Sequence, residues 1–201
     1  MGAAVTLRIA QAVDPAIGQS SRADYFVITT CGLDTATKYI HVLDIVRGRF
    51  EAPDQPKQIV AAFEKWHPYV VGVESIFYQT SLVQYLKRST TLPIREIKIR
   101  GSDNETRLMG LAAHWQAGRI VLPGRSKLPA KEGADYDSAP WLRDLEEELT
   151  AIGWHNGKEL HKHDDQAVAI AHCVNLLTLS GGVAAGNKPV YHEMVIDSEG
   201  W

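Results

Sequence analysis

Cysteine is scarce in this chain, and long apolar runs are missing. Only 2 of the 201 residues are Cys, too few for a disulfide framework or for a cysteine zinc site. Cys31 and Cys173 both fall in apolar segments, so we predict that they are reduced core residues. No run of about 18 apolar residues exists, which excludes a membrane-spanning helix. The start of the sequence is uncharged and too short for a signal peptide, so we expect an intracellular protein.

A large excess of either charge is also missing. The formal net charge is -3, which argues against a uniformly basic nucleic-acid binder. The distribution is uneven, because residues 87–131 hold 10 Lys and Arg against 3 Asp and Glu, whereas residues 132–201 hold 4 against 13. The basic segment is therefore either a solvated face or an electrostatic footprint for phosphates.

The apolar patterns that are present predict one mixed α/β domain. Strand patterns occupy residues 5–13, 25–31, 38–46, 69–74, 93–99 and 119–122. Helical spacing occupies residues 54–67, 79–88, 104–117, 141–152 and 164–179. Short links, including an expected turn at 32–35, make the first three strands an antiparallel meander, and helix-linked strands then continue the sheet in parallel.

The remaining segments are polar or rich in glycine. Residues 123–138 form a polar loop that is too long for a mere connection, and Asn156-Gly157 predicts a small hairpin within 153–160. The predicted helix at 141–152 carries a strongly acidic face, made of Asp144, Glu146, Glu147 and Glu148. We expect residues 1–180 to be the domain, and residues 181–201 to be a Gly-rich tail that is either flexible or docks a partner.

Three acidic positions share one arrangement, in which an apolar element carries the acid at its edge. Asp14 ends the first strand, Glu74 ends the fourth, and the pair Asp164-Asp165 opens the apolar last helix. Each acid also has an ordinary structural interpretation: Asp14 can start a turn, Asp164 can cap the helix and Asp165 can favour its dipole. The order of strand acid, strand acid and helix-start acids is more specific than any single member. Glu74 also ends a strand of Val and Gly, where an unpaired acid is costly to bury.

These acids predict a metal site if the first and fourth strands are parallel neighbours. Adjacent strands lie about 4.8 Å apart, so Asp14 and Glu74 can then share an ion at the carboxyl edge of the sheet. A divalent cation removes the repulsion between the carboxylates. Oxygen ligands without cysteine favour Mg²⁺ or Mn²⁺, and two such ions can promote phosphodiester cleavage.

The same segments carry a resemblance to a known family. Val13-Asp14-Pro15-Ala16, Ala23-Asp24-Tyr25, Val71-Gly72-Val73-Glu74-Ser75, Thr106-Arg107 through Ala117-Gly118-Arg119-Ile120, and Lys162-His163-Asp164-Asp165-Gln166 occur in this order. Over roughly residues 5–180 the chain resembles the C-terminal nuclease domain of the large terminase subunit of tailed bacteriophages. The resemblance implies a ribonuclease H-like α/β fold and a two-metal nuclease that cuts double-stranded viral DNA during genome packaging, in the cytoplasm of the infected host.

Carried over by position, the resemblance makes Asp14, Glu74 and Asp165 the catalytic, metal-binding acids, with Asp164 as a neighbouring or alternative ligand and Asp24 as a further acid near the site. Many members have another Asp three residues after the acidic pair, where this chain has Val168. The family's packaging ATPase needs a G-x-x-x-x-G-K-[ST] loop, and none occurs here. We therefore expect no ATP hydrolysis from this chain, which is either an excised nuclease domain or one whose motor lies on another polypeptide. The resemblance implies the packaging ATPase domain, a small terminase subunit and the portal as partners.

Basic residues near these segments are candidates for sequence-independent phosphate contacts. They are Arg95, Lys98, Arg100, Arg107, Arg125, Lys127, Lys131 and Lys162. His163 beside the acidic pair is a candidate for proton transfer or for orienting a ligand. Two alternatives stay open: a resolvase-like or transposase-like nuclease of the same fold, and a non-catalytic assembly module that docks through the tail.

Overall fold

Strand β1 (Ala3–Asp14) is the central strand of the molecule. The structure is a computed structural model, and it describes residues 3–15, 25–75, 80–98, 104–123, 139–151, 154–155, 158–159, 164–178 and 191–196. Leu7, Ala10, Ala12 and Val13 are fully buried along β1. Because these positions alternate between the two sides of the strand, both of its faces are buried.

Two antiparallel strands complete the predicted meander. β2 (Phe26–Asp34) pairs with β1, and β3 (Ile40–Gly48) pairs with β2. The turn expected at residues 32–35 is wrong in its position, because residues 32–34 continue β2 and the chain turns at residues 35–37. There the Asp34 side chain accepts hydrogen bonds from the backbone of Ala36 (2.8 Å) and Thr37 (3.3 Å), which fixes the later turn.

Three further strands of the main sheet are added in parallel. β4 (Val70–Ser75) pairs with β1, and β5 (Ile94–Lys98) pairs with β4. β6 (Ile120–Val121) pairs with the start of β3. The resulting order, β5-β4-β1-β2-β3-β6, is the predicted mixed sheet of antiparallel and parallel strands.

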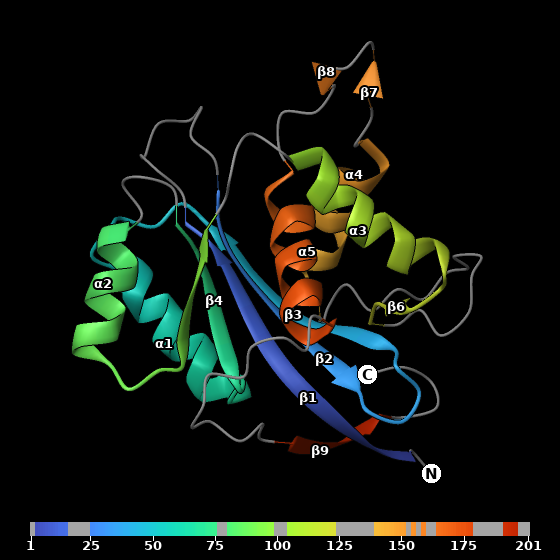
Figure 1. Cartoon of the computed structure of the whole chain (residues 1–201), viewed down its shortest axis with the longest axis horizontal. Coiled ribbons are helices and arrows are strands. Elements are labelled where there is room, and N and C mark those ends of the chain that lie inside the picture. The colour runs from blue at the N-terminus through green and yellow to red at the C-terminus, as the bar shows by residue number, and fades with distance from the viewer. Residues whose placement is uncertain are drawn as a thin grey trace.

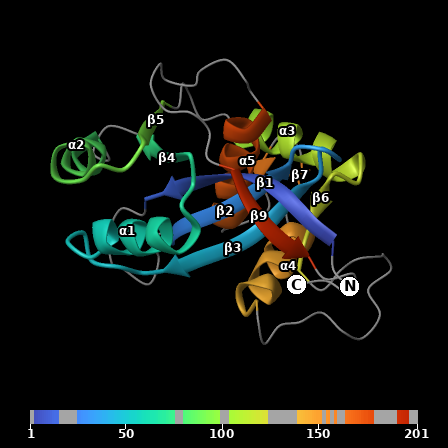
Figure 2. The same cartoon turned by 90° about the horizontal axis from the view of Figure 1, so that it is seen from below.

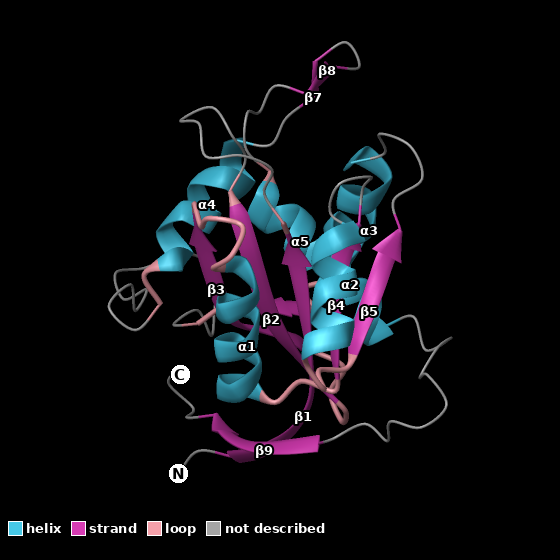
Figure 3. Ribbon diagram, turned by 90° about the vertical axis from the view of Figure 1, so that its left-hand side faces the viewer, coloured by secondary structure: helices cyan, strands magenta, loops and turns pink. Residues whose placement is uncertain are grey.

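Helices cover both faces of this sheet (Figures 1 and 3). α1 (Gln55–Trp66) and α2 (Thr80–Ser89) lie on one face, over an apolar cluster that includes Phe26, Ile59 and Val73. α3 (Asn104–Gln116), α4 (Trp141–Ala151) and α5 (Asp165–Thr178) lie on the other face. None of the helices in the described part of the chain is long and apolar enough to cross a membrane.

α5 is the most deeply buried helix, as its apolar sequence predicts. The thiol of Cys173 lies 3.1 Å from the carbonyl oxygen of Ala10 on β1, and burial raises the pKa of the Cys31 thiol, which also contacts Cys173. Both cysteines are reduced and buried, as predicted. Close contact between α5 and β4 favours glycine at position 72, because a Cβ there would lie 2.6 Å from Cδ1 of Leu176, which would have to shift.

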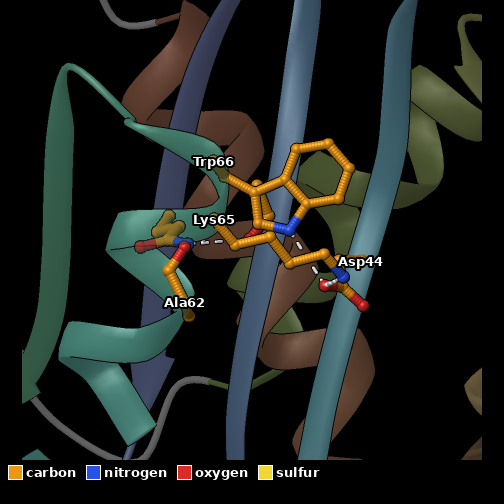
Figure 4. Close-up of polar contacts among 6 residues, drawn as sticks. Asp44, Ala62, Lys65 and Trp66 are labelled. Atoms are coloured by element: carbon orange, nitrogen blue, oxygen red, sulfur yellow. Dashed lines mark hydrogen bonds and ion pairs between the residues drawn. The ribbon is translucent and has the colours of Figure 1, made fainter. Parts of the chain in front are cut away.

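Polar contacts fasten α1 to the meander (Figure 4). The buried amide of Gln11 on β1 donates to Thr30 Oγ1 (3.0 Å) and to the carbonyl oxygen of Ala62 (2.9 Å). Asp44 on β3 accepts from Trp66 Nε1 at 2.9 Å and pairs with Lys65 at 2.7 Å. These bonds tie the helix to β1 and β3 on the face opposite α5, and Gln11 also links β1 to β2.

Two small β elements lie outside the six-strand path. β7 (Trp154–His155) and β8 (Lys158–Glu159) form the predicted hairpin. β9 (Tyr191–Ile196) pairs antiparallel with residues 3–8 of β1, beside which it lies in Figure 2. The sequence predicted no strand in this Gly-rich tail, so β9 is a new element, and it docks onto the chain's own central strand.

Candidate functional site

Asp14 and Glu74 occupy equivalent positions at the carboxyl ends of β1 and β4. The two strands pair in parallel, and their last aligned residues are Val13 and Val73. Asp14 and Glu74 therefore follow side by side, one strand spacing apart. Side chains alternate along a strand, and Ala12 packs in the cluster beneath α5, so both acids belong to the α5 face of the sheet. The predicted pairing of the two strands is confirmed.

Glu74 is buried and contacts a histidine of α5. Its side chain is 6% exposed, that of His172 is 4% exposed, and His172 Nε2 lies 2.9 Å from Glu74 Oε2. Sequence analysis missed His172. Its signal is weak, since it is a single histidine in a mostly apolar helix, but it stands two helical turns after Asp165 and so lies on the same side of α5.

Asp165 is the first residue of α5 and is also buried, at 6% exposure. Its Oδ2 accepts a hydrogen bond from the backbone N–H of Tyr25 at 3.3 Å. Tyr25 directly precedes β2, and β2 pairs Val27 with Asp14. This contact brings Asp165 to the edge of the sheet that carries Asp14.

Asp164 is half-buried and directly precedes α5. Its backbone carbonyl accepts the first helical hydrogen bond, from the N–H of Val168 at 2.9 Å. Val168 is 3% exposed and belongs to the apolar cluster beneath α5. Val168, which stands where many members of the resembled family have another Asp, is therefore part of the core.

Glu148 on α4 binds the first turn of α5. Its Oε1 accepts from the backbone N–H of Ala167 at 2.7 Å, and its Oε2 accepts from Gln166 Nε2 at 3.1 Å. The side chain satisfies a helix N–H group that has no partner within the helix. Burial raises the pKa of Glu148 to about 7, and the charge of Asp165 adds to this effect, while the two hydrogen bonds and Arg47 oppose it.

The sequence places Glu148 on an acidic face of α4, but the structure buries this residue. It is 5% exposed, whereas Glu147 is exposed. The sequence does contain a signal, because Glu148 continues the apolar stripe of Trp141 and Leu145 at helical spacing. An acid in such an apolar stripe indicates a buried polar contact.

The carboxylates have the chemistry of a site for hard divalent ions, since they supply oxygen ligands from three separate elements. Within the described residues, however, no three His, Cys, Asp or Glu side chains form a group that could hold an ion. The structure thus brings Asp14, Glu74 and Asp165 to one edge of the sheet without closing them around a common point.

The predicted basic residues are only partly within the described structure. Arg95 and Lys98 lie on edge strand β5, and since Ile97 packs toward α5, alternation puts Arg95 on the α5 face and Lys98 on the other. Arg107 lies in α3, but its side chain is outside the described structure. Also outside it are Asp24, Arg100, Arg125, Lys127, Lys131, Lys162 and His163.

Comparison with known families adds independent information. Residues 11–177 match the family model of the terminase RNaseH-like domain. No curated protein is similar enough in sequence to be recognised as a relative.

Solved structures share the fold at low identity. The large terminase of a thermophilic bacteriophage is 11% identical, with a TM-score of 0.59 over 85% of this chain and 40% of the phage protein. The chain thus spans less than half of that protein. The nuclease domains of two other large terminases are each 12% identical and cover 85% of this chain. That of bacteriophage SPP1, solved with bound Mn, has a TM-score of 0.56 and is 87% covered. That of P22 has a TM-score of 0.59 and is 82% covered. The predicted ribonuclease H-like fold is confirmed.

Proposed function

The chain belongs to the terminase RNaseH-like domain family, and we propose that it is a metal-dependent endonuclease that cuts double-stranded viral DNA during genome packaging. The observation that carries this proposal is the parallel register of β1 and β4, which sets Asp14 beside Glu74. The contact of Asp165 with Tyr25 adds a third carboxylate at the same edge.

Asp14, Glu74 and Asp165 are the residues that would hold two Mg²⁺ or Mn²⁺ ions, with Asp164 as a neighbouring ligand. The oxygen-only donor set fits these ions, and the SPP1 domain was solved with bound Mn. When bound, such ions supply activation of water and stabilisation of the charge on phosphate during phosphodiester hydrolysis. Asp24 is a further candidate acid.

The protein's own groups orient these carboxylates. His172 fixes one oxygen of Glu74, and the backbone N–H of Tyr25 fixes one oxygen of Asp165. Glu148 holds the first turn of α5, which carries Asp165. His163, next to the acidic pair in sequence, is the proposed group for proton transfer or for orienting a ligand.

DNA is the proposed substrate, and we expect it to be bound with little sequence preference. Basic residues between positions 95 and 131 supply candidate phosphate contacts, which hold the backbone without reading bases. The candidates are Arg95, Lys98, Arg100, Arg107, Arg125, Lys127 and Lys131, to which Lys162 is added. A packaging ATPase domain, a small terminase subunit and a portal are the proposed partners, and the cytoplasm of the infected host is the proposed location.

Cleavage of supercoiled plasmid tests the proposal. The protein is incubated with Mg²⁺, Mn²⁺ or EDTA, and compared with Asp14→Asn and with Glu64→Gln, which changes an exposed acid on α1. We expect nicking and linearisation that need metal, vanish in Asp14→Asn and persist in Glu64→Gln. Activity that survives in Asp14→Asn contradicts the assigned site.

The same preparation separates the alternatives. Calorimetry with Mn²⁺ distinguishes a nuclease, which binds the ion, from an assembly module, which binds none. A branched junction tested beside a linear duplex distinguishes a resolvase-like enzyme, which cuts the junction preferentially. Absence of both Mn²⁺ binding and cleavage overturns the nuclease assignment.

A further inference from the structure

Two arginines gather on the ring of Tyr25. Cζ of Arg47, on β3, lies 3.6 Å from the ring centroid, and Cζ of Arg49 lies 4.1 Å from it. These distances are within the range of cation–π contacts. Both residues lie outside the basic segment that the sequence singled out, so charge counting along the chain does not find them.

Arg47 and Arg49 differ in whether an acidic side chain pairs with their positive charge. Arg47 is partly buried and forms an ion pair with Asp144 of α4, with Nη1 and Oδ2 3.1 Å apart. Arg49 is exposed, and no acidic side chain in the described part of the chain lies within ion-pair distance of it. Arg47 therefore ties α4 to the sheet, whereas Arg49 presents its charge to solvent.

This cationic cluster lies beside the carboxylates of the proposed metal site. The backbone N–H of Tyr25 contacts Asp165 directly. Strand register pairs Asp14 with Val27, and Val27 with Arg47. Asp14 and Arg47 are thus two strands apart in one row, a separation on the order of 10 Å. Arg49 follows two residues later, beyond the end of β3, and its contact with the Tyr25 ring places it beside Arg47.

Arg47 already brings one positive charge to the Tyr25 ring, so the second charge there, that of Arg49, calls for an explanation. The contact with Tyr25 restricts the Arg49 side chain, which lowers the entropy that it loses on binding a ligand. A guanidinium has several N–H donors in a rigid plane, which suits phosphate oxygens. The ligand class that fits an exposed, held arginine next to acids of a nuclease fold is a nucleic-acid phosphate.

We propose that Arg49, held on the Tyr25 ring, binds a backbone phosphate of the DNA strand that enters the site, on the β3 side of the carboxylates. This inference rests on the proposed function. In this arrangement the DNA strand runs from the carboxyl ends of β1 and β4, over β2, toward the end of β3. Arg47 acts as a positioning residue, since it packs on the same ring and anchors α4.

The test measures binding of a fluorescein-labelled DNA duplex by anisotropy in EDTA, where no cleavage occurs. Arg49→Ala removes the charge, Arg49→Lys keeps it without the planar group, and Lys87→Ala removes an exposed charge from α2 on the opposite face. We expect Arg49→Ala to weaken binding about tenfold and to lower the salt slope by about 1. Arg49→Lys should retain most of the salt slope but bind less tightly, and Lys87→Ala should bind as the unmodified protein does.

Each outcome decides one of the two proposals. If Arg49→Ala binds the duplex like the unmodified protein, or if Lys87→Ala weakens binding equally, the phosphate site is overturned, whatever the cleavage assay shows. If the unmodified protein binds DNA through Arg49 but neither binds Mn²⁺ nor cuts plasmid with any metal, the phosphate site stands and the nuclease assignment fails. Circular dichroism of Arg49→Ala confirms that the exposed substitution leaves the fold unchanged.

Discussion

The imidazole of His172 and the carboxylate of Glu74 meet 2.9 Å apart in the interior of the protein, between α5 and β4. The contact joins the helix that begins with Asp165 to the strand that ends beside Asp14. It therefore couples the position of one candidate metal ligand to the helix that carries another.

Removal of His172 should destabilise the fold. His172→Ala removes a hydrogen-bond partner of the buried Glu74, which costs about 1–3 kcal/mol and more when the group is charged. We expect a loss of about 3 kcal/mol in the free energy of unfolding, measured by urea denaturation. His114→Ala on α3 is the matched control and should change stability by less than about 0.5 kcal/mol. An equal effect of the two variants contradicts a specific role for the His172–Glu74 contact.

Close packing of α5 on β4 predicts opposite effects of two glycine substitutions. A Cβ at Gly72 would lie 2.6 Å from Leu176 Cδ1 and 2.7 Å from Ile97 Cδ1, whereas a Cβ at Gly110 in α3 meets nothing within 4 Å. Gly72→Ala should cost about 1–3 kcal/mol through overpacking. Gly110→Ala should stabilise by about 0.5–1 kcal/mol, because alanine favours a helix. Thermal unfolding measures both.

A second substitution isolates the cause of the Gly72 effect. Ile97→Val shortens one of the two side chains that the new methyl group would meet, so Gly72→Ala should cost less in an Ile97→Val background than alone. Simple addition of the two costs would show that overpacking against Ile97 is not the reason.

The raised pKa of Glu148 predicts a pH dependence of stability in the metal-free protein. Burial raises this pKa from an ordinary value of 4.5 to about 7, so the folded state holds a proton that the unfolded state releases between these values. Stability from this group is therefore full below about pH 4.5, falls as the pH rises to about 7, and then stays constant. Glu148→Gln should lack this fall in a melting series with EDTA, and Glu147→Gln, at the exposed neighbour, should retain it.

Much of the fold could be predicted from local patterns. β-branched runs and helical spacing gave strands and helices whose ends agree with the structure within a few residues. The rule of right-handed crossovers allowed β4 to lie parallel beside β1, as it does. Turn position was less certain, because residues 32–34 satisfy their backbone by pairing with β1. β9 forms only through pairing with the distant β1, so its six residues, which follow a Gly-rich segment, gave no reliable local signal for a strand.

The candidate site was predictable only in its acids. A strand that ends in Asp or Glu is visible in sequence, but the partner that satisfies a buried carboxylate is chosen by packing. His172 reaches Glu74 across 98 positions, and Glu148 reaches α5 from another helix. Arg49 acquires its place from the stacking on Tyr25. In each case the residue type alone carries no signal in the sequence, and only the tertiary contact shows what the residue does.

Binding of Mn²⁺ should distinguish Asp165 from Asp164 as a ligand. Asp165 is buried and anchored by the N–H of Tyr25, whereas Asp164 is half-buried. An ion that binds only the folded protein raises its unfolding temperature, so Mn²⁺ should stabilise the unmodified protein. Asp165→Asn should abolish this rise while keeping an oxygen that can accept from Tyr25, and Asp164→Asn should retain part of it. A normal rise in Asp165→Asn together with none in Asp164→Asn would move the ligand assignment by one residue, to the other member of the acidic pair.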